Sequence, residues 1–304
     1  MNVVDFHMHF FSAPFFEALA AQAPGADAPQ EQLARLAERT GIELPSADLG
    51  EHLARWTAEM DRHEVQHMAA FASLPEEVPA VAEAAARADG RLTPFALVNP
   101  RVEGVPARVR ALIEEKGFGG VLVFPAMHHF HVAGPVAAGL LEVLNEYAAT
   151  VFVHCGLLVV KLRDLLGLPR PQDLSFANPL GLIPAANAWP RVHFVIPHFG
   201  AGFLRETLMA GSMCPNVYVD TSSSNGWIAT QAPDLTLTQV FERTLDVFGP
   251  QRVLFGTDSN VFPAGWRADR RDEQLEALAS LETPAADVEL IFGGNARRLL
   301  EARG

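Results

Sequence analysis

Short apolar runs alternate along the chain with longer stretches in which apolar residues recur at helical spacing. Eight such runs occur, and most are followed by a segment rich in Ala, Leu, Glu and Arg. This repetition is typical of strand–helix units that build a parallel sheet. The predicted strands are 2–7, 66–72, 92–98, 120–124, 151–154, 192–197, 216–220 and 252–255.

Helical periodicity predicts the helices between these strands. They are expected at 52–63, 76–88, 106–116, 135–148, 202–213 and 237–248, with a terminal pair at 267–281 and 285–302. Eight strand–helix repeats that close on themselves predict an α/β fold, the (β/α)8 TIM barrel, whose catalytic residues lie at the C-terminal ends of the strands. An open doubly wound sheet is the alternative. Its phosphate-binding fingerprint fails here, because Gly200 and Gly202 are followed by Arg205 where the third glycine belongs.

Two segments interrupt the repeat and predict extended loops at the mouth of the barrel. Residues 10–49 follow the first strand, and residues 157–178 follow the fifth. Loops longer than about 15 residues are commonly functional lids or linkers, and loops after barrel strands lie at the active-site end. We therefore interpret the chain as one domain, 1–304, with an insertion at 10–50 after the first strand.

Composition and charge narrow the class of protein. With 304 residues, 49% of them hydrophobic, the chain is suited to a folded enzyme-sized domain and not to a disordered one. A net charge of −13 without a Lys/Arg cluster disfavours nucleic acid as a partner. The most apolar stretch, 151–160, is too short to span a bilayer, so no membrane partner is expected. Two isolated cysteines and the lack of a signal-peptide pattern predict a cytoplasmic protein.

Histidines and an aspartate follow four of the predicted strands. The first strand ends in the pair His7 and His9, whose imidazoles project to the same side. His154 ends the fifth strand, His198 follows the sixth, and Asp258 follows the eighth. Any one of these residues alone is more simply explained by a backbone hydrogen bond or a helix cap. Together they predict one metal site, since imidazoles and a carboxylate are ligands for zinc and its first-row neighbours.

Several short sequence motifs surround these single residues or occur elsewhere in the chain. They are Asp-Phe-His-Met-His-Phe at 5–10 and the segments 59–61, 117–121, 177–180, 197–202, 256–258 and 293–299. With them, nearly the whole chain resembles the metal-dependent amidohydrolase superfamily, in its branch similar to aminocarboxymuconate-semialdehyde decarboxylase. The resemblance implies a metal held by His7, His9, His154 and Asp258, with His198 as the base or orienting group for water. Relatives in this branch are commonly dimers, so the resemblance also implies a homodimer.

The resemblance bears on the number of metal ions as well. Many binuclear relatives bridge two metals with a carboxylated lysine at the end of strand four, whereas this chain has no lysine between Gly120 and Pro125. We therefore expect one divalent ion per chain, Zn²⁺ first, with Mn²⁺ or another first-row metal as alternatives. Such an ion lowers the pKa of water from 15.7 to about 7 and polarises a carbonyl group.

Three functions agree with this pattern. The first is a metal-dependent hydrolase of a small organic substrate, acidic or acyl, in which His198 and Asp258 are catalytic. The second is a non-oxidative decarboxylase or hydro-lyase of an aromatic or unsaturated carboxylic acid on the same site. The third is a catalytically silent barrel that binds a ligand or a partner, and the intact set of strand-end residues argues against it. A serine hydrolase is disfavoured, because residues 222–224 lack the strand–GxSxG–helix setting of a nucleophile.

Substrate contacts are expected from side chains that follow the strands. The candidates are His128, His129, His131, Arg163 and Arg267, with Phe10, Phe11 and Trp227 as apolar walls. Arginine binds a carboxylate through two parallel hydrogen bonds, and a local positive group acts on a nearby ligand whatever the net charge of the chain. These residues therefore predict an anionic substrate. A second metal site at the three closely spaced histidines is the less favoured interpretation.

Overall fold

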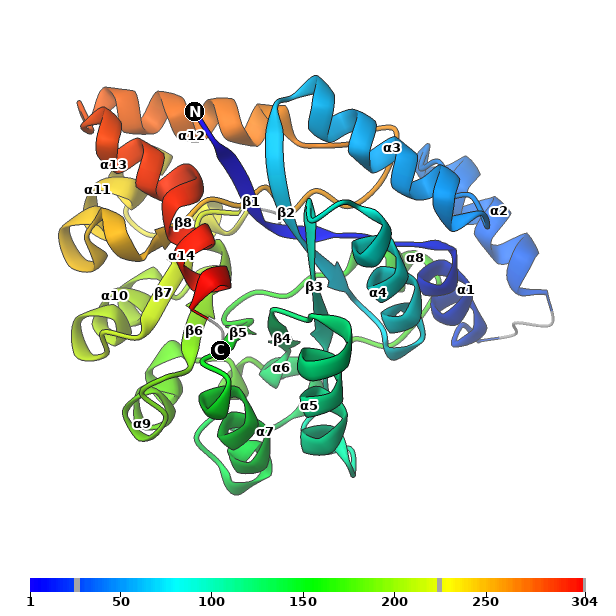
Figure 1. The fold of residues 1–304 in the computed structure, drawn as a ribbon, viewed down its shortest axis with the longest axis horizontal. Helices are drawn as coiled ribbons and strands as arrows, with labels where there is room; N and C mark the ends of the chain where they lie inside the picture. Colours follow the sequence, from blue (N-terminus) through cyan, green and yellow to red (C-terminus); the bar gives the residue numbers. More distant parts are fainter. Residues whose placement is uncertain (25–27, 223–225, 303–304) are drawn as a thin grey trace.

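The computed structural model describes residues 1–24, 28–222 and 226–302. Its eight strands form one parallel sheet in which each strand pairs with the next in the sequence. The strands are β1 (Val3–His9), β2 (Val65–Ala72), β3 (Leu92–Leu97), β4 (Gly120–Val123), β5 (Thr150–Val153), β6 (His193–Ile196), β7 (Val217–Asp220) and β8 (Val253–Leu254). With helices surrounding the sheet, this confirms the predicted (β/α)8 TIM barrel (Figure 1). The number of domains stays a prediction.

Helices connect consecutive strands and cover the outside of the sheet (Figure 1). They are α3 (Leu49–Arg62), α4 (Val78–Arg87), α5 (Val105–Lys116), α6 (Pro125–His128), α7 (Pro135–Glu146), α9 (Ile183–Ala188), α10 (Leu204–Met213) and α11 (Leu237–Phe248), followed by α12 (Ala268–Ser280), α13 (Ala285–Glu289) and α14 (Asn295–Glu301). A π-helical segment, Leu290–Gly294, divides the terminal helix predicted at 285–302. The sequence did not predict α6 and α9, because four and six residues are too few for a periodic signal.

Backbone hydrogen bonds between β1 and the segment after β8 close the barrel. Phe6 N donates to Phe255 O, and His9 N donates to Ser259 O, each at 2.9 Å. Asp258 N donates to His7 O, also at 2.9 Å. Asp258 therefore lies beside the end of β1, although β8 itself ends at Leu254.

Phenylalanines fill the inside of the barrel below the strand ends. The rings of Phe6, Phe71, Phe95 and Phe152 pack against one another with centroids 4.8 to 5.8 Å apart. Leu299 of α14 belongs to the same buried cluster. Aromatic rings packed in mutual contact make a rigid apolar layer, and the polar strand ends lie on top of it.

The insertions after β1 and β5 contain helices and pack against each other. The first contains α1 (Ala13–Ala21) and α2 (Pro29–Thr40), and the second contains α8 (Lys161–Leu165). Their apolar side chains form a separate buried cluster, which includes Phe15, Phe16, Leu162 and Leu166. In Figure 1, α1, α2 and α8 lie together at one side of the barrel. We call the described parts of residues 10–48 and 157–168 the cap.

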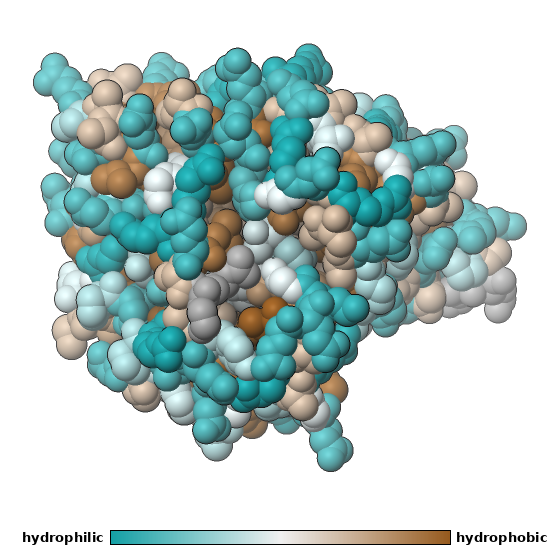
Figure 2. All heavy atoms as spheres, in the orientation of Figure 1, coloured by the Kyte–Doolittle hydropathy of each residue, from teal (hydrophilic) through white to brown (hydrophobic). Residues whose placement is uncertain are grey.

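The outer surface differs from this apolar interior. Figure 2 shows that the face seen in Figure 1 is covered mainly by hydrophilic side chains, with smaller hydrophobic areas between them. Exposed large apolar side chains such as Val102, in the loop before α5, and Met213, at the end of α10, lie in different parts of the chain. Within the described ranges, no helix combines the length and the apolar character needed to cross a membrane.

Candidate active site

An irregularity in β1 directs both of its histidines into the barrel mouth. Asp5 pairs with Met68 of β2 and Met8 pairs with Ala70, so three steps along β1 match two along β2. The ring of His7 consequently lies 4.8 Å from Phe71 inside the barrel and 5.4 Å from the ring of His9. A bulge beside an active site commonly redirects a side chain in this way.

Three ligand atoms converge where β1 meets the segment after β8. Asp258 Oδ1 lies 3.3 Å from His9 Nε2 and 3.6 Å from His7 Nε2. One ligand atom from each of the three residues lies within 4.8 Å of the others, close enough for all three to bind one metal ion. His7 and Asp258 are buried, and His9 is mostly buried. We call these three side chains, with His154 and His198, the polar cluster.

Hydrogen bonds hold the other nitrogen of each β1 histidine. His7 Nδ1 lies 2.7 Å from Asp220 Oδ2, and His9 Nδ1 lies 2.6 Å from Ser73 Oγ. When Nδ1 of each histidine carries the proton and donates it to this partner, the lone pair of Nε2 faces Asp258. Partners of this kind fix the tautomer and the ring orientation of histidines that bind metals.

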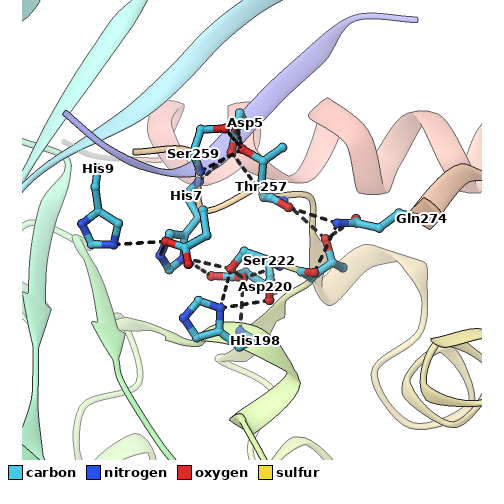
Figure 3. A network of polar contacts seen from close by, with 12 residues as sticks. Asp5, His7, His9, His198, Asp220, Ser222, Thr257, Ser259 and Gln274 are labelled. Carbon is cyan, nitrogen blue, oxygen red and sulfur yellow. Dashed lines mark hydrogen bonds and ion pairs between the residues drawn. The ribbon is translucent and has the colours of Figure 1, made fainter. Parts of the chain in front are cut away.

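Asp220, the last residue of β7, connects His7 with His198. Its Oδ1 accepts hydrogen bonds from the backbone nitrogens of Ser222 at 2.8 Å and His198 at 3.3 Å, and it contacts the Ser222 hydroxyl. His198 Nδ1 donates to the Ser222 carbonyl oxygen at 2.9 Å, which leaves Nε2 as a proton acceptor. Figure 3 shows Asp220 and Ser222 next to the rings of His7 and His198. Ser223 and Ser224 lie outside the described residues.

Burial and neighbouring charges set the protonation of these groups. Burial opposes the ionisation of Asp258. Its hydrogen bond with His9 and the charge of the nearby His7 ring outweigh this effect, so the pKa of Asp258 is lowered. Burial lowers the pKa of His198, and the nearby His7 adds to this effect. For His7 burial acts in the same direction, but the charge of Asp220 outweighs it and raises the pKa. A cation bound at His7 Nε2 would therefore displace a proton.

His154, which follows β5, faces the same cavity as the other histidines. Its ring lies 5.3 Å from that of His198, and burial lowers its pKa well below the usual value. Among the described residues, its buried Nδ1 has no hydrogen-bond partner. A buried polar atom without a partner is costly, and an ion bound by this imidazole would offset that cost. Among the described residues, the converging set that fits a divalent metal consists of His7, His9 and Asp258, and His154 as a fourth ligand stays a prediction.

A cavity of about 410 Å³ lies above the polar cluster. All five residues of the polar cluster line it, with apolar side chains from the strand ends and from the cap around them. The strand ends contribute Leu97, Leu122 and Phe124. Two basic side chains of α8, Lys161 and Arg163, also line the cavity. A mostly apolar cavity with a few convergent polar groups is the usual form of a small-molecule site.

The structure brings only some of the predicted substrate contacts to this cavity. Arg163 and Phe11 line it, as does Lys161, which sequence reasoning did not single out. Phe10 is buried against the ring of His52, and Trp227 is buried near Phe199. The described residues that line the cavity include neither of these aromatic side chains.

Arg267 and the three closely spaced histidines also lie apart from the described lining of the cavity. Arg267 forms two hydrogen bonds with Asp269, at 2.8 and 2.9 Å. The rings of His129 and His131 pack against Phe176, and burial lowers the pKa of His128 to about 4. A role of these side chains in substrate binding stays a prediction.

Sequence reasoning missed the residues that orient the histidines. Asp220 ends β7 and Ser73 directly follows β2, so both carry the strand-end signal that identified His154. Ser222 offered a weaker signal. His198 donates its hydrogen bond to the backbone carbonyl oxygen of Ser222, and a residue of any type could supply that oxygen.

Comparison with known proteins is consistent with this geometry. The family model described as Amidohydrolase matches residues 4–302. No curated protein matches the chain. Among solved structures, a 5-carboxyvanillate decarboxylase from Novosphingobium aromaticivorans, complexed with manganese and 4-hydroxy-3-methoxy-5-nitrobenzoic acid, is similar with a TM-score of 0.63 and 17% identity over 99% of this chain and 96% of that one.

Two further structures share the fold. A probable 2-pyrone-4,6-dicarboxylic acid hydrolase from Acinetobacter baumannii, with citric acid bound, has a TM-score of 0.62 and 14% identity over 99% of this chain and 100% of that one. An amidohydrolase from Burkholderia multivorans with bound zinc has a TM-score of 0.64 and 17% identity over 99% of each chain. At these identities the likeness shows a common barrel fold.

Proposed function

This chain belongs to the amidohydrolase family of enzymes, and from this premise we propose that it is a metal-dependent hydrolase of a small organic substrate, acidic or acyl in character. The observation that carries the proposal is the convergence of His7 Nε2, His9 Nε2 and Asp258 Oδ1 beside one cavity. Non-oxidative decarboxylation or a hydro-lyase reaction on an aromatic or unsaturated acid is the second candidate.

One divalent ion is proposed for the site, held by His7, His9, His154 and Asp258. The donor set and the unpartnered Nδ1 of His154 among the described residues support this assignment. When bound, such an ion lowers the pKa of water and polarises a carbonyl oxygen. Zn²⁺ is the first choice and Mn²⁺ the alternative, in agreement with the metals in the Burkholderia and Novosphingobium structures.

His198 is the proposed base. Its Nδ1 is engaged by the Ser222 carbonyl oxygen, and burial keeps the ring neutral at neutral pH, so Nε2 is free to accept a proton from the attacking water. Asp258 remains ionised, because its hydrogen bond with His9 and the nearby imidazoles lower its pKa. Proton acceptance by His198 thus does not require the ring to leave its hydrogen bond.

Lys161 and Arg163 give the cavity a local positive charge that opposes the net charge of −13. Among the described residues, the buried Arg163 Nε has no partner, and the guanidinium donates one long hydrogen bond, to Pro169 O at 3.4 Å. Two basic side chains on one wall attract an anionic group of the substrate through charge-assisted hydrogen bonds. This charge supports the acidic substrate in the proposal.

One observation favours the second candidate. Leu97, Leu122 and Phe124 line the cavity beside the polar cluster, so a carboxylate placed there would face apolar side chains. Apolar surroundings penalise a localised charge, and this penalty falls when the charge spreads over an unsaturated ring as carbon dioxide leaves.

An isotope experiment distinguishes the two reactions. The zinc-supplemented protein is incubated in H₂¹⁸O with a panel of lactones, esters and hydroxybenzoic acids. Hydrolysis places ¹⁸O in the new carboxyl group, whereas decarboxylation releases CO₂ and leaves a solvent hydrogen on the product carbon. Turnover that persists unchanged after the metal is removed by a chelator would contradict both candidates.

A further inference from the structure

The cavity changes character between the barrel and the cap. Near the strand ends it is lined by the polar cluster, and further out mainly by apolar side chains of the two insertions, with Thr40, Lys161 and Arg163 between them. We define the cap subsite by the apolar side chains Phe11, Phe15, Leu19, Ile42, Leu162 and Leu165. The cap subsite opens into the same cavity as the polar cluster, so one bound molecule can contact both.

Phe11 connects the two regions. Its ring lies 5.1 Å from the ring of His9 and stacks on Phe15 at 4.0 Å with an interplanar angle of 8°. Its backbone has a φ of 43°, in the left-handed region that bulky residues rarely adopt. Such backbone strain persists only where the surrounding structure holds it, and it is concentrated at functional sites. The strained residue extends an aromatic surface from His9 into the cap.

The cap subsite is built into a packed wall. Phe15, Leu19 and Leu162 are buried and belong to the apolar cluster that joins α1, α2 and α8. Because these side chains pack against other buried residues, the subsite is already formed before a ligand binds. At about 410 Å³ the cavity lies in the range of pockets that enclose a whole ligand, which is roughly 300 to 1,000 Å³.

We propose that the cap subsite binds an extended apolar substituent of the substrate, an alkyl chain or an aryl group, while the reacting group lies at the polar cluster. The position of the reacting group rests on the proposed function, whereas the apolar subsite rests on the lining alone. A polar substituent of the same length would lose its hydrogen bonds with water against Leu19, Ile42 and Leu165. The enzyme should therefore discriminate between acids by the polarity of their chains.

Equilibrium binding tests the subsite without turnover. Acetate, butanoate, hexanoate and octanoate are titrated calorimetrically into the zinc-supplemented protein and into the metal-free protein. Burial of each methylene group should lower Kd about fourfold. Gluconate, a six-carbon acid with a hydroxylated chain, should bind at least tenfold more weakly than hexanoate. A Kd that does not depend on chain length, or equal binding of gluconate and hexanoate, would overturn the proposal.

A variant locates the binding to the cap. Ile42→Trp places a larger side chain in the half-buried outer wall and should weaken octanoate binding at least tenfold while leaving acetate unchanged. Val136→Trp is the matched control, because Val136 is 42% exposed on α7. This variant should change the Kd of neither octanoate nor acetate. Equal loss for acetate and octanoate in Ile42→Trp would contradict the assignment. The chain-length series stays measurable in a protein without turnover, so failure of the subsite and failure of the proposed function are distinguishable.

Discussion

Asp220 Oδ2 lies 2.7 Å from His7 Nδ1, and the two residues are 213 positions apart in the sequence. The same carboxylate also accepts hydrogen bonds from the backbone of Ser222 and His198, so it supports a candidate ligand and the candidate base together. Both oxygens of Asp220 are occupied by these hydrogen bonds. We therefore expect Asp220 to orient His7 and His198 and not to contact the substrate itself.

Asp220→Asn should weaken zinc binding by about 10- to 100-fold, because asparagine keeps the shape but not the charge that orients His7 and makes its ring more basic. Competition with a chromogenic chelator measures the affinity, and saturated protein should still contain one ion per chain. Asp246→Asn, at an exposed position of α11, is the control and should bind zinc normally. Equal affinities of the two variants would show that Asp220 does not tune the site.

His198→Asn should lower kcat by about 10²- to 10⁴-fold and retain the metal, because the proposed role of His198 is to accept a proton. Asp258→Ala should lower both turnover and metal content, since its Oδ1 is one of the three converging atoms. Elemental analysis and steady-state kinetics on the same samples separate the two roles. Loss of the ion in His198→Asn would make His198 a ligand and contradict its assignment as base.

The fold and the strand-end histidines could be predicted because their signals are local. An apolar run followed by a helical stretch identifies each strand, and the strand's end gives the position of His154. The bulge that turns both Phe6 and His7 inward could not be predicted, because it depends on how β1 pairs with β2. The hydrogen bond between Asp220 and His7 likewise arises only when the barrel closes.

Substrate contacts were harder to predict, because side chains after a strand can turn towards the cavity or away from it. Arg163 and Arg267 carry the same sequence signal, yet one lines the cavity and the other pairs with Asp269 two residues later. Trp227 packs into the core near Phe199, where burial of its large ring stabilises the fold. Packing between distant segments, and not the local pattern, decides these orientations.

Arg163→Met should raise KM for an acidic substrate at least tenfold more than for a neutral analogue, because Arg163 lines the cavity and methionine keeps the apolar bulk without the charge. Arg108→Met, at an exposed position of α5, is the control, and it should change KM little for either compound. Steady-state kinetics with an acid and its amide or methyl ester measure the difference. Equal changes for charged and neutral compounds in Arg163→Met would show that this residue does not bind the carboxylate.

Glu77 joins the loops after β1 and β2 through hydrogen bonds. It is fully buried, with Oε1 accepting hydrogen bonds from Ser12 N at 2.7 Å and Ser12 Oγ at 3.1 Å, and Oε2 accepting one from Ser73 N at 2.7 Å. Burial nevertheless outweighs these three hydrogen bonds and raises the pKa of Glu77 from its usual 4.5 to about 7. Ser73 in turn contacts His9, so the ionisation of Glu77 is coupled to the support of the site.

The raised pKa of Glu77 predicts that folding stability decreases as pH rises. Between pH 4.5 and 7 the folded state binds a proton that the unfolded state has lost, so the free energy of unfolding should fall by about 3 kcal/mol across this window. Glu77→Gln cannot ionise and should remove this component, so the variant should gain stability relative to the native protein as pH rises. Urea unfolding of the metal-free proteins at pH 5 and 8 measures the difference, with the exposed Glu76→Gln as control. Parallel pH profiles for the native protein and Glu77→Gln would show that Glu77 is ionised throughout this window.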